Sequence, residues 1–229
     1  MREKLIIYGN GQMARMFLHF ARTQFDVVAF TVDRAVVEER EIEGLPVIPF
    51  EEITTHLPPA SHAMITAVGY LAMNALRAEK YAAALALGYR FVNYVHPSVV
   101  WHPTLVAGQN NVILDHVAMH PYTRLGNCNF ICSNASIGHG CRIGDNCWIN
   151  SGVSIGGETQ LGDGCFLGAG CWHPEPDDLA KIRALVVEKP DHWFAARDDR
   201  RFRKDWELRG DSHGPACCQR RLGHRAHRH

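Results

Sequence analysis

Residues 125–166 read LGNCNF-ICSNAS-IGHGCR-IGDNCW-INSGVS-IGGETQ-LGDGCF, a run of six-residue units that each begin with an aliphatic side chain. The period extends in both directions, so that an apolar residue returns at every sixth position from Trp101 to Leu167. Helices repeat every 3.6 residues and strands every 2, so a strict period of six indicates a supersecondary unit. We expect a left-handed parallel β-helix in which each unit forms one flat side of a triangular coil.

Two further features of the repeat support this interpretation. The inward apolar column consists of Trp101, Ala107, Ile113, Met119, Leu125, Ile131, Ile137, Ile143, Ile149, Ile155, Leu161 and Leu167. Two residues earlier, the later units carry small or β-branched side chains, at Thr123, Asn129, Ala135, Cys141, Cys147, Val153, Thr159 and Cys165. Glycine often follows the apolar residue, where a Cβ would obstruct the corner. We expect about four coils, and we expect residues 172–178 to end the pattern.

The composition restricts the remaining possibilities. The chain has 229 residues, and its 24 Lys plus Arg balance its 24 Asp plus Glu, so no nucleic acid or anionic membrane is indicated as a partner. No apolar stretch approaches the roughly eighteen residues of a membrane span, and we expect a cytoplasmic protein. Four cysteines recur at the spacing of the solenoid and not as the close pairs of a zinc site. We therefore expect packing and no metal at Cys141, Cys147, Cys165 and Cys171.

The first part of the chain follows a different pattern. Strand-like runs at residues 4–8, 27–31 and 63–68 alternate with a helix-like run that ends at Ala21 and another at residues 76–87. This alternation predicts a small parallel sheet of Rossmann type. The turn Gly9-Asn10-Gly11-Gln12 lies between the first strand and the first helix, where backbone N–H groups can bind phosphate.

Three more positions belong to the same expected ligand site. Asp33 lies close to twenty residues beyond the glycine turn, where an acidic side chain can bind ribose hydroxyls or a base edge. The third strand ends at Val68 and leads to Gly69. Tight packing of the turn and capping of a strand end by Asp33 are alternative explanations. Such a domain does not reveal whether the nucleotide is a redox cofactor or part of a substrate.

Together the two halves resemble the NeuD/PglD-type sugar acetyltransferases over roughly residues 4–172. The resemblance is carried by the Rossmann-like domain, the junction His96-Pro97-Ser98, the segment GYLAMN at residues 69–74 with Arg77, and IGHGC at residues 137–141. It implies a homotrimer that uses acetyl-CoA to acetylate an amino or hydroxyl group of a sugar. The N-terminal domain would hold the nucleotide of a nucleotide-linked amino sugar. The implied substrate contacts are Gly9, Asn10, Gly11, Gln12, Asp33, Val68 and Gly69.

His139 is the candidate general base. An amine or hydroxyl that attacks a thioester must lose a proton, and an imidazole with a pKa of about 6.5 can accept it near neutral pH. His139 follows the inward-facing Ile137 by two residues, so we expect it outside the prism, in a groove between subunits. The resemblance assigns the general base to this position.

Other positions near His139 depart from the family pattern. Gly140 stands where members often have glutamate, so an orienting carboxylate must come from elsewhere, such as Asp145 or a neighbouring chain. Trp148 stands where some members have a second histidine that contacts the acetyl-CoA thioester. Gly157 and Ala169 match positions that line the pantetheine groove. Trp148, Gly157 and Ala169 are therefore the coenzyme contacts that the resemblance implies.

We accordingly expect three regions: a Rossmann-like nucleotide-sugar-binding domain at 1–95, a left-handed β-helix acyltransferase domain at 96–190, and a charged, partly disordered tail at 191–229. The expected function is acetyl transfer from acetyl-CoA to an amino group of a nucleotide-linked sugar in surface-polysaccharide or glycan biosynthesis. Alternatives are O-acetylation of a sialic-acid-like sugar and a non-catalytic trimeric sugar-nucleotide-binding protein. An NAD-dependent oxidoreductase is disfavoured because the Rossmann part is short.

Overall fold

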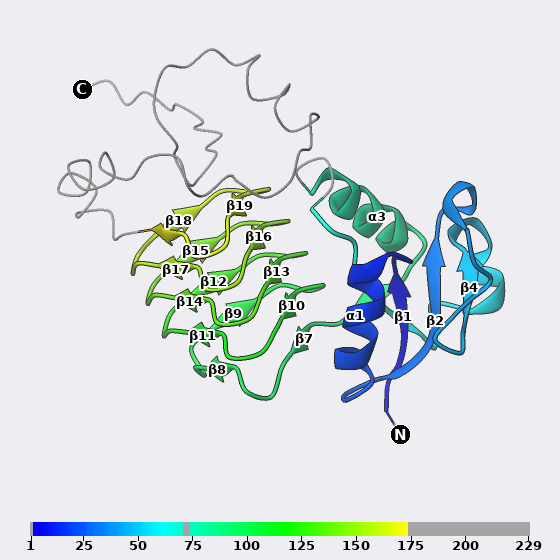
Figure 1. The fold of residues 1–229 in the computed structure, drawn as a ribbon, viewed down its shortest axis with the longest axis horizontal. Coiled ribbons are helices and arrows are strands. Elements are labelled where there is room, and N and C mark those ends of the chain that lie inside the picture. Colours follow the sequence, from blue (N-terminus) through cyan, green and yellow to red (C-terminus); the bar gives the residue numbers. More distant parts are fainter. Residues whose placement is uncertain (1, 71–73, 174–229) are drawn as a thin grey trace, which may run out of the picture.

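The structure is a computed structural model that describes residues 2–70 and 74–173. An α/β part with a six-stranded sheet is followed by a three-sided solenoid whose sides are parallel sheets of two-residue strands (Figure 1). This architecture confirms the expected Rossmann-like part followed by a left-handed β-helix. In the described residues, no helix is long and apolar enough to cross a membrane.

The α/β part contains the strands predicted from the sequence and three more. Its strands are β1 (Lys4–Tyr8), β2 (Asp26–Val32), β3 (Glu41–Ile42), β4 (Leu45–Pro49), β5 (Ala63–Thr66) and β6 (Arg90–Phe91). Its helices are α1 (Gln12–Ala21), α2 (Ile53–His56) and α3 (Ala75–Ala86), with 3-10 turns η1 (Arg34–Val36) and η2 (Phe50–Glu52). The sheet order is β3-β4-β2-β1-β5-β6, and all pairs are parallel except β3 with β4.

Up to residue 173, where the described part of the chain ends, the solenoid consists of fourteen short strands. They are β7 (Tyr94–Val95), β8 (Val100–Trp101), β9 (Val106–Ala107), β10 (Val112–Ile113), β11 (Ala118–Met119), β12 (Arg124–Leu125), β13 (Phe130–Ile131), β14 (Ser136–Ile137), β15 (Arg142–Ile143), β16 (Trp148–Ile149), β17 (Ser154–Ile155), β18 (Gln160–Leu161), β19 (Phe166–Leu167) and β20 (Trp172–His173). Every third strand stacks in register, which gives the inner sheet β7-β10-β13-β16-β19, the β8 sheet β8-β11-β14-β17-β20 and the β9 sheet β9-β12-β15-β18.

The two columns predicted from the sequence fill the prism. From Ile113 to Leu167 the apolar column exposes at most 6% of any residue, and the small column from Thr123 to Cys165 exposes at most 9%. Burial of each such aliphatic side chain contributes about 1.5–3 kcal/mol relative to an exposed position. Cys171, at the end of the described solenoid, is half-buried and packs against the same core.

Strand pairing extends the solenoid by one strand on each side of the apolar column at residues 101–167. The first strand, β7, lies within residues 94–95, which were expected to belong to the N-terminal domain. At the other end, β20 pairs with β17, so the repeat continues one strand beyond its expected end. Trp101 belongs to the first coil and remains 36% exposed, although the period assigns it to the core.

The corner glycines are required by the stacking of coils. A Cβ on Gly138 would lie 2.5 Å from the backbone nitrogen of Gly157 in the next coil, a distance that no Cβ tolerates. The left-handed residue of the corner comes two positions later, at Gly140, whose φ is +65°. The glycine after the apolar residue therefore permits close contact between coils, as the sequence predicted, while a different residue makes the turn.

The inner sheet packs against the α/β part, as Figure 1 shows. Val112, Phe130 and Trp148 of the inner sheet share one buried cluster with Phe17 and other apolar residues of the α/β part. The corner between the β8 and β9 sheets lies opposite this packed face. We call it the His139 edge; it comprises residues 102–105, 120–123, 138–141 and 156–159.

Several expectations concern residues that the structure does not describe. The end of the predicted β-helix domain at residues 174–190 and the predicted tail at 191–229 lie outside the described residues. The same holds for residues 71–73 of the segment GYLAMN. The expected domain boundaries therefore stay predictions, apart from the earlier start of the solenoid.

Candidate active site

The predicted nucleotide turn lies at the carboxyl edge of the sheet. Gly9 directly follows β1 with φ +136°, and a Cβ there would lie 2.8 Å from the carbonyl oxygen of Ala67, so only glycine fits this position. Gly11 caps α1, and no atom of the described residues lies within 4 Å of a Cβ added there, so this part of the chain leaves space at the first turn of the helix. Asn10 donates its Nδ2 to the carbonyl oxygen of Val36 at 2.8 Å.

The surroundings of this turn form the switch point of the sheet. β1 lies between β2 and β5 in the sheet. The chain passes from β1 through α1 to β2 on one side of β1, and it later returns to form β5 on the other side of β1. Ligands of open α/β sheets bind at such a point, beyond the carboxyl ends of the strands. Gln12 is exposed at the start of α1, and Val68 and Gly69 are half-buried after β5. The seven residues predicted to bind substrate thus come from the carboxyl ends of β1, β2 and β5.

Asp33 is held in a polar cluster that the sequence did not predict. Its Oδ1 accepts a hydrogen bond from the Tyr8 hydroxyl at 2.8 Å, and its Oδ2 lies 2.7 Å from Lys80 Nζ. Lys80 also lies 2.8 Å from Glu79 Oε1. Partial burial acts to raise the pKa of Asp33, but the hydrogen bonds from Lys80 and Tyr8 outweigh it and hold this pKa below its usual value. Burial, reinforced by Asp33, raises the pKa of Tyr8.

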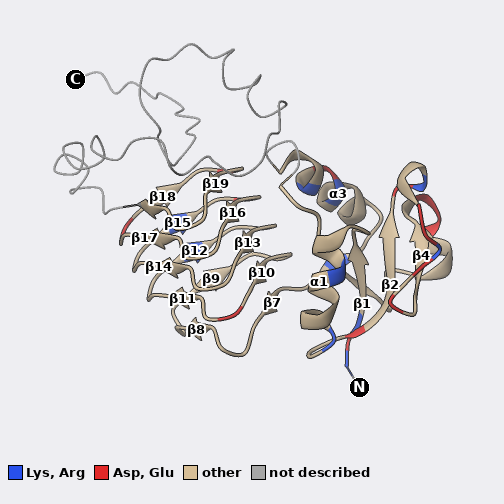
Figure 2. Ribbon diagram, viewed as in Figure 1, with Lys and Arg blue, Asp and Glu red and all other residues tan. Residues whose placement is uncertain are grey.

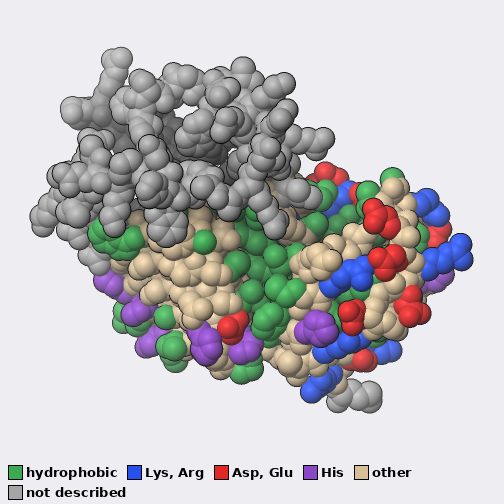
Figure 3. All heavy atoms as spheres, in the orientation of Figure 1, with side chains coloured by type: hydrophobic (Ala, Val, Ile, Leu, Met, Phe, Trp, Pro, Cys, Tyr) green, Lys and Arg blue, Asp and Glu red, His purple; other side chains and the backbone are tan. Residues whose placement is uncertain are grey.

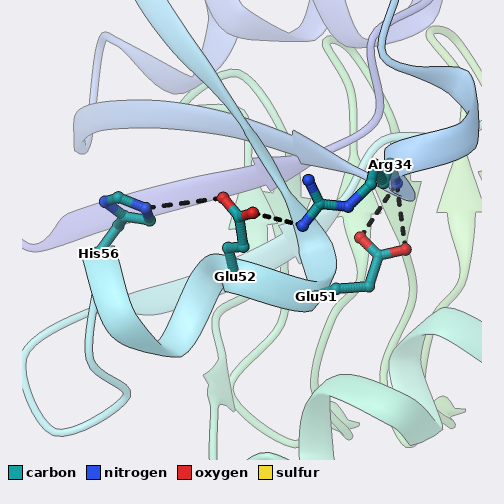
Figure 4. A network of polar contacts seen from close by, with 4 residues as sticks. All are labelled: Arg34, Glu51, Glu52 and His56. Atoms are coloured by element: carbon teal, nitrogen blue, oxygen red, sulfur yellow. Dashed lines mark hydrogen bonds and ion pairs between the residues drawn. The ribbon is translucent and has the colours of Figure 1, made fainter.

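A second polar network fixes the chain just after Asp33 (Figure 4). Glu51 accepts from the backbone nitrogen of Arg34 with both carboxylate oxygens, at 3.2 and 3.0 Å. Glu52 pairs with the Arg34 guanidinium and lies 3.8 Å from His56 Nε2. These contacts tie η1 to η2 and α2, and they set the position of the loop that carries Asp33.

His139 is exposed on the His139 edge, as the sequence predicted. Its carbonyl oxygen accepts from the backbone nitrogen of Glu158 at 2.7 Å. Gly157 occupies the same corner in the next coil, one rung after His139. The Cγ of Glu158 lies 3.5 Å from the position of an added Cβ on Gly140. The next coil therefore brings a carboxylate beside the glycine that stands where the family often has glutamate.

Exposure alone does not single out His139. Figure 3 shows several histidines on the solenoid, and His102 and His120 are also exposed on the His139 edge. Within residues 2–70 and 74–173, no three or more His, Cys, Asp or Glu side chains gather as a metal site would require. The glycine and the carboxylate in the adjoining coil distinguish His139 from the other histidines.

Asp145 occupies a different corner and does not reach His139. It lies between the β9 sheet and the inner sheet, where its Oδ1 accepts from the backbone nitrogen of Asn127 at 2.6 Å. The same oxygen accepts from Asn127 Nδ2 at 3.2 Å. The suggestion that Asp145 orients the imidazole within one chain is therefore wrong, because the carboxylate serves the stacking of another edge.

Two of the implied coenzyme contacts lie apart from His139. Trp148 is in the inner sheet and only 1% exposed, with its ring stacked on Phe130 at 4.4 Å and the Arg77 guanidinium carbon 5.6 Å from its centroid. This burial leaves no accessible ring for a coenzyme. Ala169 is exposed, but it lies at the corner between the inner sheet and the β8 sheet. Gly157 is the one of the three that shares the corner of His139.

Comparisons with known proteins agree with this fold. A family model described as bacterial transferase hexapeptide (six repeats) matches residues 140–172. The acetyltransferase domain of PglB from Neisseria gonorrhoeae FA1090, in complex with acetyl coenzyme A, is 24% identical, with a TM-score of 0.58 over 76% of this chain and 94% of that chain. A histidine-to-asparagine mutant of perosamine N-acetyltransferase from Caulobacter crescentus, in complex with CoA and GDP-perosamine, is 25% identical, with a TM-score of 0.57 over 75% of this chain and 90% of that chain.

The chain carries the bacterial transferase hexapeptide repeat and has the fold of sugar N-acetyltransferases. A second family model, of a conserved hypothetical protein (DUF2461), matches residues 158–219, most of which lie outside the described residues. No curated protein sequence matches the chain. The solved structures therefore support the assignment of the fold, and the hexapeptide family model supports the assignment of the repeat.

In this hexapeptide-repeat chain, sequence reasoning missed three residues near the candidate sites. Tyr8 and Lys80 contact Asp33, and Glu158 lies beside Gly140. The signal for Glu158 was present in the period, because it follows Gly140 by one full coil. No comparable signal exists for Lys80, since its contact depends on how α3 crosses the edge of the sheet.

Proposed function

We propose that this chain is an acetyl-CoA-dependent acetyltransferase that modifies the amino group of a nucleotide-linked sugar in glycan biosynthesis. The hexapeptide match and the fold shared with the perosamine N-acetyltransferase support this reaction class. The switch-point site offers a phosphate-binding turn and an ionised carboxylate for the nucleotide. His139 offers an exposed imidazole for the proton transfer. With these ligands and no membrane span in the described part, we propose that it acts in the cytoplasm.

The observation that carries the proposal is the position of His139 relative to the nucleotide site. The inner sheet packs against the chain's own α/β part, while His139 lies on the opposite edge of the prism. One chain therefore keeps its two candidate sites apart, and a neighbouring chain must bring its α/β part to His139 for one substrate to meet both. A closed ring of three chains satisfies this need at every site, and we propose a homotrimer.

The proposed reaction uses His139 as a general base. The sugar amine attacks the thioester carbonyl, a C–N bond forms, and the C–S bond breaks with release of the thiol. His139 accepts the proton that the attacking nitrogen loses and returns it to the leaving sulfur. Glu158 would orient the imidazole from the next coil. Gly157, and Ala169 from a second chain, would line the coenzyme groove, whereas the buried Trp148 has no part in it.

The test measures release of CoA with a panel of nucleotide-linked amino sugars. His139→Ala should lower the turnover rate by roughly a hundredfold to ten-thousandfold, the usual contribution of a general base. Glu158→Gln should lower it less and leave both KM values unchanged. The matched control is His102→Ala, which removes an exposed histidine two coils earlier on the same edge. Full turnover by His139→Ala would refute the mechanism.

The product distinguishes the proposed N-transfer from its O-transfer alternative. Hydroxylamine cleaves an acetyl ester and leaves an acetamide intact. A stable acetyl group on the sugar supports the proposal, and a labile group assigns the chain to O-acetylation. Binding of nucleotide sugars without any turnover would instead support the alternative of a non-catalytic sugar-nucleotide-binding protein.

A further inference from the structure

The β9 sheet carries a pair of arginines beside the His139 edge. Arg142 begins β15 directly after the corner that holds His139, and Arg124 is its register partner on β12. Both side chains are exposed, and the next rungs of this outward column are Val106 and Gln160. Figure 2 shows blue on β12 and β15 in a solenoid that otherwise carries few charges.

This arrangement is unfavourable without a further partner. Register partners on adjacent parallel strands lie about 4.8 Å apart, and like charges placed directly opposite each other destabilise a sheet. In residues 2–70 and 74–173, neither Arg124 nor Arg142 forms an ion pair with an acidic side chain. Asp145, the nearest carboxylate along the chain from Arg142, bonds to Asn127 at the next corner. The pair therefore places two exposed arginines on adjacent rungs of one sheet, without a carboxylate partner among the described residues.

We infer that Arg124 and Arg142 form a subsite for the diphosphate of the acceptor. Two guanidinium forks can each bind a phosphoryl group through paired hydrogen bonds, which a single lysine cannot do. The inference rests on the proposed function, which requires a phosphorylated acceptor to reach His139. It adds a specificity-determining contact on the solenoid to the nucleotide contacts of the neighbouring α/β part.

The order of the coils favours the acceptor over the coenzyme. Arg124 lies in the coil before His139, whereas Gly157, the proposed coenzyme contact on this edge, lies in the coil after it. The two ligands of a transfer reaction must approach the base from different sides. A diphosphate on the Arg124 side therefore belongs to the nucleotide-linked sugar, and coenzyme A binds on the Gly157 side.

The experiment measures steady-state kinetics of Arg124→Gln, Arg142→Gln and the double variant. Each single change should raise the KM for the nucleotide-linked sugar roughly tenfold to hundredfold, as expected for loss of a charged hydrogen-bonded contact. The KM for acetyl-CoA should stay unchanged. The matched control is Arg90→Gln, which removes the same charge from an exposed arginine of the α/β part that pairs with Glu3. A higher KM for acetyl-CoA, or no change in either KM, would overturn the assignment.

A second measurement separates this inference from the proposed function. Binding of inorganic pyrophosphate to the full chain is followed by calorimetry, without any turnover. The wild-type chain should bind it, and the double variant should bind it at least tenfold more weakly. Equal binding by both chains overturns the subsite even where the enzyme is active. Loss of binding in the double variant supports the subsite even where no tested sugar is acetylated.

Discussion

At the residue scale, the site combines positions that the sequence could and could not identify. His139 and Asp33 were predicted from a family resemblance and from spacing, and both lie at the surface where a ligand can reach them. Tyr8 and Lys80 were not predicted, because their role depends on three elements meeting at one point. A carboxylate 2.7 Å from an ammonium group and 2.8 Å from a hydroxyl is held in place before any ligand arrives.

Asp33 should make stability depend on pH in a defined direction. Its pKa is lowered in the folded chain, so its ionised form stabilises the fold above the unfolded value of about 3.9. That stability is lost as the pH falls through the lower folded value. Asp33→Asn should therefore destabilise the chain by about 1 kcal/mol at pH 7, a small value because the side chain is one-third exposed.

Urea unfolding at pH 7 and pH 2.5 checks this expectation. The difference between wild type and Asp33→Asn should shrink at the lower pH, because protonation of Asp33 removes the charge on which its contacts with Lys80 and Tyr8 depend. Asp26→Asn is the control, because Asp26 is exposed and forms no ion pair among the described residues. An undiminished difference at pH 2.5 would show that lost packing, not lost charge, causes the effect.

At the element scale, regular patterns were predictable and short irregular strands were not. The period of six identified the solenoid because the rungs from Ile113 to Leu167 repeat the same burial. β4 was missed because proline is unusual inside a strand, and this strand contains Pro46 and Pro49. In the sheet, β4 lies next to the edge strand β3. β7 was missed because its residues were assigned to the N-terminal domain, although Val95 lies six residues before Trp101 and pairs in register with Ile113 of β10.

The corner glycines give a prediction about coil stacking. Gly138→Ala should lower the free energy of unfolding by about 1–3 kcal/mol, because its Cβ would meet the backbone of Gly157 at 2.5 Å. Gly162→Ala is the matched control: it occupies the same repeat position after Leu161, and among the described residues nothing lies within 4 Å of its added Cβ. Thermal unfolding of the two variants side by side measures the difference. Equal melting temperatures would mean that the coils can separate to admit a methyl group.

At the scale of the whole molecule, the sequence predicted both halves but not how they face each other. Each half carries a local pattern, whereas the packing of the inner sheet on the α/β part depends on residues such as Phe17 and Trp148, far apart in the chain. Trp148 shows the consequence. Its assignment to the coenzyme came from a position in a motif, and the contact between the halves buries it.

The proposed arrangement builds the active site from two chains, which a mixing experiment can detect. His139→Ala removes the base, and Gly11→Trp fills the open space at the first turn of α1 without backbone strain, since Gly11 has φ −80°. Each variant alone should be nearly inactive. In an equimolar mixture of reassociated chains, roughly a quarter of the interfaces pair an intact His139 with an intact turn from the neighbour, and a matching fraction of activity should return.

The control for this experiment mixes each variant with itself under the same unfolding and refolding steps. These mixtures should stay inactive, because no interface then contains both intact groups. If His139 and the glycine turn of the same chain formed one site, every chain in the two-variant mixture would lack one of these two groups. The mixture would then stay inactive. Persistent inactivity of that mixture, with mixed trimers demonstrated by native mass spectrometry, would place both sites in a single chain and contradict the proposed arrangement.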